Sequence, residues 1–561
     1  MSDTLAKLLQ RTVAQHPEGE AQLSKDDKGR FRPTTYSQFY QEVQSCAAGL
    51  QELGVRRGDL VGLVSDNRKE WLISDLALLS LGAADVPRGR DATPQELEYI
   101  LRYSQCRITF VEHKELLEKM KPILPNVKDL ETIIMLDPRW TDSTSVSHKQ
   151  VIPFSQVMST GAQVLRQDPG RIEAEIDRGT PDETATVIFT SGTTGEPKGV
   201  MLSNRNFIHQ TDHIHEIVDI TPGDRWLSVL PVWHSFERIL QYIIIASGSA
   251  IAYSKPIGKI MLQDFQKVSP TWMGSVPRIW ESVKNGVYQN VSKKSPTARG
   301  LFHFFIWVGS AHAYSYNMIR GWLPQFRKRL YPLDVLLGII PFLLLTPLKA
   351  LGNALVYKNI KQKLGGRFKA GVSGGGSLPA SVDSFFQAVG IVLLDGYGLT
   401  ETAPVIGIRF FNRRVPHTVS PFPGTEIRIE DESGTPLGPG VKGVIKVRGP
   451  QVMQGYYRRD DLTRQMISPE GWLNTGDIGV WTHRGEYAIR GRAKDTIVLS
   501  GGENVEPVPI ESKLRESPYI EQAVVIGQDE KFLGALIVID RKEVEQYVKD
   551  NAIHYIPRGD F

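Results

Sequence analysis

Short apolar runs that alternate with longer amphipathic stretches constrain the fold of this chain more than any other feature. The runs are rich in β-branched residues, are bounded by Gly, Pro or Asp, and lie at 186–189, 226–230, 250–253 and 391–394. Stretches of helical periodicity, such as 35–53 and 378–389, lie between such runs. Strands alternating with helices predict mainly parallel sheets covered by helices, which is an α/β fold. A chain of 561 residues is also too long for one compact core.

The pattern changes after about Thr425. Short strand-like runs joined by Gly-rich turns, at 426–430, 444–447 and 486–489, predict a smaller β-rich subdomain over about 425–490. A new α/β pattern follows Lys494, with strands near 523–526 and 535–539. We therefore predict a large N-terminal domain of packed mixed sheets and helices over 1–493. A hinge and a small α+β C-terminal domain are predicted over 494–561.

Positive charge is concentrated in one segment, residues 282–370. The segment contains 14 lysine and arginine residues and one acid, Asp334, so it carries +13 while the rest of the chain carries −9. This asymmetry predicts an anionic partner for one region rather than for the whole protein, and we expect no nucleic-acid partner. The chain has only Cys46 and Cys106, and its N-terminus lacks a secretory signal. Both features indicate a cytoplasmic protein without a disulfide framework or a cysteine metal cluster.

An uncharged apolar run, Val335–Leu348, lies inside this basic segment and is interrupted by Gly338, Pro341 and Pro347. A membrane-spanning helix needs about 20 apolar residues, so the run is predicted to be too short and too broken to span. Aromatic side chains beside cations are typical of an anionic bilayer surface and predict peripheral membrane binding through about 282–370. A buried helical hairpin with solvated basic ends explains the composition equally well. The two interpretations can hold for different faces.

A Gly- and Thr-rich stretch, residues 190–199, directly follows the strand-like run at 187–189. Glycines let successive backbone N–H groups turn toward one point, which creates a nest for an anion. The hydroxyl groups and one lysine add further donors, and the spacing differs from that of a Walker loop. We therefore predict polyphosphate binding by Thr190, Ser191, Gly192, Thr193, Thr194, Gly195 and Lys198.

Further motifs follow in order along the chain. They are Leu230-Pro-Val-Trp-His-Ser-Phe-Glu237, Ser373-Gly-Gly-Gly-Ser-Leu-Pro379, Gly396-Tyr-Gly-Leu-Thr-Glu-Thr402, Trp472-Leu-Asn-Thr-Gly-Asp477 and Gly491-Arg-Ala-Lys-Asp495. Together with the stretch at 190–199 they resemble the adenylate-forming superfamily of acyl-CoA synthetases, luciferases and peptide-synthetase adenylation domains. The resemblance covers essentially the whole chain.

The resemblance implies ATP and Mg²⁺ as ligands. The adenine site is expected at Gly374, Gly375, Gly376, Tyr397 and Gly398, where the Tyr397 ring offers a flat face. The ribose is expected at Asp477, whose carboxylate accepts hydrogen bonds from hydroxyl groups, and at Arg492.

The same resemblance assigns catalytic roles to Lys198, Thr400 and Glu401. Hard oxygen ligands for Mg²⁺ are expected from Thr194 and Glu401. His234 stays open between a positioning role for the substrate carboxylate and a packed structural histidine. Lys494 occupies the position of the family's hinge.

The insertion at about 282–370 resembles that of the long-chain fatty acyl members, which implies a fatty acid substrate. The acceptor of the acyl group is either acyl carrier protein or coenzyme A, both of which are anionic. Residues 86–91, Val-Pro-Arg-Gly-Arg-Asp, resemble the cyanobacterial and plastid acyl-carrier-protein ligases and favour the carrier protein. The expected reaction is therefore ATP-dependent formation of acyl-adenylate, followed by transfer to a thiol.

The C-terminal part departs from the family pattern. Lys513, Lys531, Lys542 and Lys549 do not lie in the family's catalytic-lysine motif, so the C-terminal domain is expected to be truncated and that lysine to lie beyond Phe561. Two other functions remain open. One is a membrane-bound nucleotide sensor without turnover, and the other is luciferase-like oxidation, which shares every motif.

Overall fold

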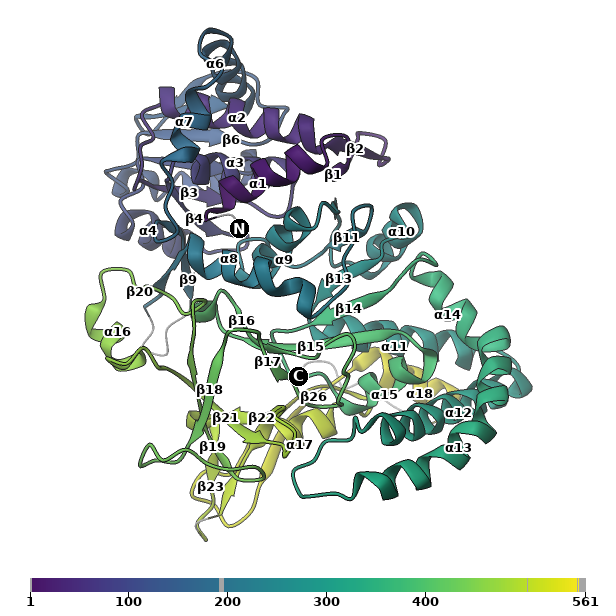
Figure 1. Ribbon diagram of the computed structural model, residues 1–561. Coiled ribbons are helices and arrows are strands. Elements are labelled where there is room, and N and C mark those ends of the chain that lie inside the picture. Colours follow the sequence, from purple (N-terminus) through teal and green to yellow (C-terminus); the bar gives the residue numbers. More distant parts are fainter. Residues whose placement is uncertain (1–2, 191–195, 502, 552, 554–561) are drawn as a thin grey trace.

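The computed structural model describes residues 3–190, 196–501, 503–551 and 553, and its described part contains two nine-stranded sheets (Figure 1). The first sheet runs in the order β17 (Ser420–Pro421), β16 (Val405–Ile408), β15 (Val392–Gly398), β14 (Ala370–Ser373), β13 (Trp272–Ser275), β11 (Arg225–Ser228), β12 (Ala250–Tyr253), β1 (Glu20–Lys25) and β2 (Phe31–Thr35). The second runs in the order β20 (Gly455–Tyr456), β10 (Lys198–Ser203), β9 (Thr184–Thr190), β4 (Ala84–Arg88), β3 (Leu60–Val64), β5 (Ile108–Val111), β6 (Thr132–Met135), β8 (Lys149–Pro153) and β7 (Thr144–Val146). The central strands of both sheets are parallel, as the alternating pattern predicts.

A layer of helices packs between the two sheets and shares one hydrophobic core with them. Its members are α1 (Leu5–Gln15), α2 (Tyr36–Glu52), α3 (Lys69–Ser80), α8 (Asn204–His213) and α9 (Ser235–Ala246). Every residue from Trp71 to Ser80 of α3 is buried, and so is nearly all of α9. Because both helices are almost fully buried, most of their residues are apolar, and the charged residues Asp75 and Arg238 pair with each other in the core.

The other α-helices lie on the outer faces of the sheets and at the two ends of the molecule. They are α4 (Pro94–Tyr103), α5 (Lys114–Met120), α6 (Phe154–Gln167), α7 (Arg171–Asp177), α10 (Gly258–Val268), α11 (Pro277–Ser292), α12 (Pro296–Arg320), α13 (Tyr331–Gly352), α14 (Lys358–Lys363), α15 (Ala380–Val389), α16 (Asp460–Met466), α17 (Pro507–Leu514) and α18 (Arg541–Asp550). Trp280 of α11, Phe302 and Phe305 of α12 and Phe386 of α15 join the far face of the first sheet in a second core.

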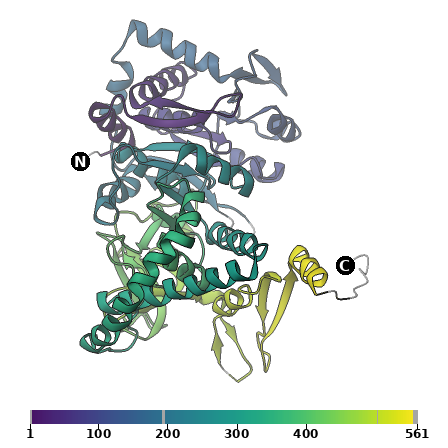
Figure 2. The same ribbon diagram turned by 90° about the vertical axis from the view of Figure 1, so that its right-hand side faces the viewer.

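A four-stranded antiparallel sheet follows, formed by β18 (Glu426–Glu430), β19 (Lys442–Arg448), β21 (Leu473–Trp481) and β22 (Tyr487–Arg492). One strand from the same stretch, β20, instead pairs with β10 in the second large sheet. The chain after Arg492 forms the ribbons β23 (Ile497–Val498) with β24 (Asn504–Val505) and β25 (Ile520–Ile526) with β26 (Gly534–Ile539). Figure 2 shows this C-terminal part in yellow, projecting from the rest of the molecule. The predicted α/β class with a small C-terminal domain is confirmed.

The apolar run at 335–348 is helical throughout, so the prediction that its prolines break it is wrong. The helix α13 continues through a π-helical turn, Asn353–Tyr357, into α14. Pro341 and Pro347 each remove one backbone donor, but both are exposed, so the freed carbonyl groups of the preceding turn are not sealed in a core. Tyr331–Lys363 is the one helix among the described residues that is long and apolar enough to cross a membrane.

The α12–α13 hairpin has two different faces. The α12 side turns Phe302 and Phe305 into the second core, as a buried hairpin would. The outer side of α13 leaves large apolar side chains 57–68% exposed, namely Leu336, Leu337, Ile340, Leu343 and Leu344. The inner face agrees with the buried-hairpin interpretation, and membrane binding through the exposed face stays a prediction.

Candidate functional site

The strands β9 and β10 are antiparallel neighbours, and Thr190 is the register partner of Lys198. The segment between them, Ser191, Gly192, Thr193, Thr194 and Gly195, lies outside the described residues, so the roles predicted for it remain predictions. The Lys198 ammonium lies over the ring of Tyr456, 5.5 Å from its centroid. This cation–π contact holds the lysine beside the strand that ends the sheet.

Glu401 lies in a 3-10 turn, Thr400–Thr402, directly after β15. The Tyr456 hydroxyl donates a hydrogen bond to Oε1 of Glu401, at 2.9 Å. Burial raises the pKa of Tyr456, and the Glu401 charge adds to this effect, so the hydroxyl stays protonated and remains a donor. The contact fixes the Glu401 carboxylate close to the ring that holds Lys198.

Sequence reasoning missed Tyr456 because its role depends on the pairing of β20 with β10. It also missed Gln210 of α8, whose side-chain amide donates to the carbonyl of Thr402 at 2.9 Å. The backbone N–H of Met453 donates to the carbonyl of Glu401 at 2.8 Å. Gln210 of α8 and the backbone at Met453 therefore both hold the turn around Glu401 in place. No local sequence pattern predicts these contacts.

Tyr397, Asp477 and Arg492 meet at one point although they come from different sheets. The Tyr397 hydroxyl donates to Oδ2 of Asp477 at 2.6 Å, and Nε of Arg492 lies 3.2 Å from Oδ1. Asp477 and Arg492 are register partners on β21 and β22. Burial raises the pKa of Asp477, while its contacts with Tyr397 and Arg492 act in the opposite direction. The carboxylate is thus held in one orientation, and only 4% of Asp477 is exposed.

The glycine motif at 374–376 begins where β14 ends. Ser275, Ser373 and Asp395 are neighbours in register, so the carboxyl ends of β13 and β14 lie side by side, next to the middle of β15. Ligands of open α/β sheets bind at this edge. A side chain at Gly374 would come within 3.1 Å of the Phe236 ring, so Phe236 would have to shift to accommodate a larger residue there.

The rest of the two glycine motifs lies at the same edge. Gly375 has a φ of +73°, and Gly376 lies beside Pro277. A side chain at Gly398 would meet the Pro404 carbonyl at 1.9 Å, so no other residue fits there. Gly398, between Tyr397 and Glu401, therefore packs directly against Pro404, which follows the 3-10 turn.

His234 caps the N-terminus of α9. Its Nδ1 accepts a hydrogen bond from the backbone N–H of Phe236 at 3.2 Å, which leaves Nε2 as the protonated nitrogen of the neutral ring. The ring is exposed, yet the surrounding protein desolvates it and lowers its pKa. His234 is therefore neutral near pH 7. The structural role is clear, and the positioning role for a substrate remains a prediction.

A buried charge network in the helix that His234 caps connects α9 to α3 and to the second sheet. Arg238 donates to Asp85 of β4 at 2.8 Å and to the Thr186 hydroxyl of β9 at 3.0 Å, and it also pairs with Asp75 of α3. Tyr242 donates to Asp75 at 2.8 Å. A buried charge pair that loses one partner is strongly destabilised. The network therefore fixes the start of α9 relative to the strand that ends at Thr190. In the sequence, the sign of this network was Arg238, a charged residue in a segment of mostly apolar residues.

Lys494 is exposed and lies in a 3-10 turn, Ala493–Asp495, directly after β22. After the turn, Thr496 donates a hydrogen bond to Glu506 at 3.0 Å, and Glu506 lies 3.7 Å from Lys442 of the preceding sheet. The turn itself has few side-chain contacts, which is compatible with the predicted hinge.

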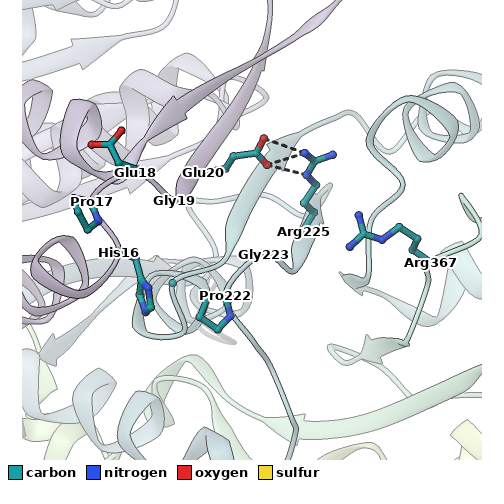
Figure 3. A pocket seen from close by; sticks show the side chains of 10 residues that line it. His16, Pro17, Glu18, Gly19, Glu20, Pro222, Gly223, Arg225 and Arg367 are labelled. Carbon is teal, nitrogen blue, oxygen red and sulfur yellow. Dashed lines mark hydrogen bonds and ion pairs between the residues drawn. The ribbon is translucent and has the colours of Figure 1, made fainter.

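A cavity of about 450 Å³ lies elsewhere, between the N-terminal segment and the first sheet. Figure 3 shows Glu20 turned toward Arg225, and their ion pair of 2.8 Å neutralises the arginine. None of the predicted site residues lines this cavity. The candidate site is instead built from two sets of contacts, Lys198 and Glu401 around Tyr456, and Tyr397 with Asp477 and Arg492.

Comparison with known proteins identifies the family. Residues 9–457 match the AMP-binding enzyme family, and residues 494–557 match the AMP-binding enzyme C-terminal domain. Among solved structures, an anthranilate CoA ligase in complex with anthranoyl-AMP superposes with a TM-score of 0.71 at 20% identity, covering 99% of this chain and 91% of that one. The O-succinylbenzoate CoA synthetase of Bacillus subtilis, in complex with ATP and magnesium, gives 0.64 at 20% identity and covers 97% and 92%. These likenesses establish the fold.

Curated relatives are more similar in sequence. A chloroplastic long-chain-fatty-acid–acyl-carrier-protein ligase of Arabidopsis thaliana is 37% identical over 542 residues, which cover 91% of this chain and 73% of the relative. A long-chain-fatty-acid–CoA ligase of Mycobacterium bovis is 31% identical over 530 residues, covering 93% and 80%. The chain therefore belongs to the AMP-binding enzyme family, as the order of its motifs predicts.

Proposed function

We propose that this protein uses ATP to convert a long-chain fatty acid into acyl-adenylate and pyrophosphate, and then transfers the acyl group to the phosphopantetheine thiol of acyl carrier protein. The observation that carries the proposal is the contact of Tyr397 with Asp477, which also pairs with Arg492. Glu401 follows Tyr397 in the same motif, in the turn after β15. This arrangement offers an aromatic face, an oriented carboxylate and a cation beside a second carboxylate. A mononucleotide with a charged phosphate chain has matching groups.

The residues fit Mg²⁺ as well as ATP. Oε1 of Glu401 takes the Tyr456 hydrogen bond, whereas Oε2 has no hydrogen-bond partner among the described residues. The described residues contain no group of three or more His, Cys, Asp or Glu side chains that could hold a metal alone. Glu401 would therefore share the ion with phosphate oxygens, which is how Mg²⁺ is commonly bound. When bound, the ion would neutralise part of the phosphate charge.

The first half-reaction brings two anions together. A carboxylate oxygen of the fatty acid attacks the α-phosphorus, the new O–P bond forms, and the bond to the bridging oxygen of pyrophosphate breaks. Lys198 would offset negative charge on the phosphates, and Asp477 with Arg492 would hold the ribose so that the α-phosphate faces the acid. Neutral His234, at the start of α9, would position the carboxylate. In the second half-reaction the thiol attacks the acyl carbon, AMP leaves, and the thiol proton is lost.

The choice of acyl carrier protein over coenzyme A rests on two observations. Residues 86–91 resemble the carrier-protein ligases, and the Arabidopsis ligase is 37% identical, against 31% for the mycobacterial CoA ligase. Mass spectrometry of products from ATP, palmitate and each acceptor offered separately tests the choice. Palmitoyl-carrier protein as the main product is expected. Palmitoyl-CoA as the sole product would show that coenzyme A is the acceptor. The absence of acyl-adenylate with either acceptor would favour a nucleotide sensor without turnover.

We also propose that Lys494 is the hinge about which the C-terminal domain moves between the two half-reactions. Lys494→Pro restricts φ, so it should slow thioester formation by at least about tenfold more than adenylate formation. Rapid-quench measurement of both half-reactions tests this, with Lys494→Ala as the control that removes the side chain and leaves the backbone free. Equal losses in both half-reactions would argue against a hinge.

The exposed apolar face of α13 and the basic segment around it support peripheral binding to an anionic membrane. Arg327 and Lys328 are exposed, whereas Arg329 pairs with Asp334 at 2.8 Å. Reversing the charge of Arg327 and Lys328 should weaken binding to phosphatidylglycerol vesicles, since each basic residue near such a surface contributes about 1 kcal/mol.

Co-sedimentation with vesicles measures the effect of this double substitution. The matched control reverses Lys128 and Lys531, two exposed lysines outside the segment, with the same change in net charge. A control that loses as much binding as the Arg327 and Lys328 variant would show that the effect is only one of net charge.

A further inference from the structure

The loop that joins β11 to α9, residues 229–234, comes from the first sheet but is held by residues that follow strands of the second. Asn67 lies in the loop after β3. Its side chain accepts a hydrogen bond from the backbone N–H of Val232 at 2.9 Å and donates to the carbonyl of Leu230 at 2.6 Å. The backbone that leads to His234 is therefore fixed from the opposite sheet.

Trp233 of the same loop packs against the end of β4. The Arg88 guanidinium lies over the Trp233 ring, 4.5 Å from its centroid. Nε of Arg88 also donates a hydrogen bond to Glu96 of α4 at 3.0 Å, so the guanidinium is held in its own plane while it stacks on the indole. A planar cation that is paired with a carboxylate and stacked on tryptophan restricts the movement of both side chains.

Gly89 lets the indole come this close to the chain. A Cβ at residue 89 would lie 2.2 Å from Nε1 of Trp233 and 2.4 Å from Oδ1 of Asp91. The Asp91 carboxylate is the end of an exposed side chain and can move, whereas the indole is a rigid ring under Arg88. The motif at 86–91 therefore supplies both the cation that stacks on the indole and the space in which the indole lies.

Trp233 connects these contacts to His234. The two rings meet edge to face at 69°, with centroids 6.5 Å apart. The His234 ring is exposed, and its Nδ1 accepts the hydrogen bond from the backbone N–H of Phe236. The position of the other nitrogen, Nε2, therefore depends on how Trp233 packs beside the ring. Arg88 and Gly89 are called the loop clamp below.

We propose that the loop clamp positions His234 for the carboxylate of the acid substrate, acting through the Trp233 ring. The inference rests on the proposed function, because it takes His234 as the residue that faces this carboxylate. It also assigns the motif at 86–91 to the acid rather than to the acceptor. The motif then marks the carrier-protein branch without contacting the carrier protein itself.

The first test removes the cation and keeps its aliphatic stem. Arg88→Met should lower kcat/KM for laurate in pyrophosphate exchange about tenfold and leave the KM for ATP unchanged, because only the carboxylate loses its position. Arg102→Met is the matched control, since Arg102 also pairs with a glutamate of α4, Glu98, at 3.3 Å. The control should keep the kinetics of the wild type, and thermal unfolding verifies the fold of each variant.

The second test fills the space at residue 89. Gly89→Ala should lower kcat/KM for laurate about hundredfold, because displacing a positioned group by about 1 Å can have an effect of this size. Gly170→Ala is the matched control, since a Cβ there would have no atom within 4 Å. Adding Trp233→Phe to Gly89→Ala should restore part of the lost activity, because the smaller ring leaves room for the methyl group.

Acids of different length distinguish positioning of the carboxylate from contact with the acyl chain. Decanoate, laurate and palmitate should lose kcat/KM by the same factor in Arg88→Met, because they share the carboxylate. A loss that grows with chain length would overturn the inference. So would a KM for ATP that rises as much as the KM for the acid, or a double variant no more active than Gly89→Ala.

A competition between the two acceptors tests the assignment of the motif. With carrier protein and coenzyme A offered together, mass spectrometry should find the same ratio of thioesters in Arg88→Met as in the wild type. A changed ratio would show that the motif acts on the acceptor and would overturn the assignment. Unchanged kcat/KM in both variants of an active enzyme would overturn the loop clamp alone. Absence of exchange in the wild type would instead remove the proposed function, and this inference with it.

Discussion

Replacing Asp477 by asparagine is expected to raise the KM for ATP about hundredfold in pyrophosphate exchange. Hydrogen bonds to a charged group contribute about 1.5–3 kcal/mol each, and two ribose hydroxyls on this carboxylate together correspond to about two orders of magnitude. Asparagine keeps the shape of the side chain. It loses the charge that pairs with Arg492 at 3.2 Å and one of the two acceptor oxygens.

Two controls separate nucleotide binding from folding. Glu432→Gln makes the same chemical change at an exposed turn and should leave the KM for ATP unchanged. Tyr397→Phe removes only the hydroxyl that donates to Asp477 at 2.6 Å, and it should raise the KM by a smaller factor. Thermal unfolding of each variant verifies the fold. An Asp477→Asn enzyme with a normal KM for ATP would place the ribose elsewhere.

Replacing Glu401 by glutamine is expected to lower the rate of adenylate formation by about 10²–10³, with a much smaller change in nucleotide affinity. Electrostatic groups aimed at charge that develops in the transition state typically have effects of this size on kcat. Glutamine keeps an acceptor for the Tyr456 hydroxyl, which donates to Glu401 at 2.9 Å, so the turn should stay in place. The loss would therefore report on the negative charge.

A magnesium titration sharpens this second test. If Glu401 shares the ion with the phosphates, the Glu401→Gln enzyme should need more Mg²⁺ to reach half of its own maximal rate. Tyr456→Phe keeps the carboxylate and removes only its hydrogen-bond donor, so its magnesium dependence should stay close to that of the wild type. If the Glu401→Gln enzyme has the magnesium dependence of the wild type, Glu401 is not a ligand of the ion. Any loss of rate would then come from the loss of negative charge alone.

The identity of the family was accessible from sequence because its motifs are local. Glycine at 374 and 398, and the polar residues that follow them, sit where strands end and the backbone makes a close approach, and such positions tolerate few residue types. The strands at 250–253 and 426–430 were predicted with their observed bounds because turn-forming residues such as Gly, Pro and Asp flank both short runs. Residues 191–195 lie outside the described part of the chain, so the phosphate loop itself remains a prediction.

By itself the sequence determined the alternation of strands and helices, the order of the motifs and the charge of segment 282–370. Only the tertiary structure decided which distant groups meet. Tyr456 reaches Glu401 through the pairing of β20 with β10, and Arg238 finds its aspartates on two other elements. The helix α13 runs unbroken through two prolines because their positions are exposed. Hydrogen-bond partners and burial depend on contacts between residues far apart in the chain, and local sequence patterns do not predict those contacts.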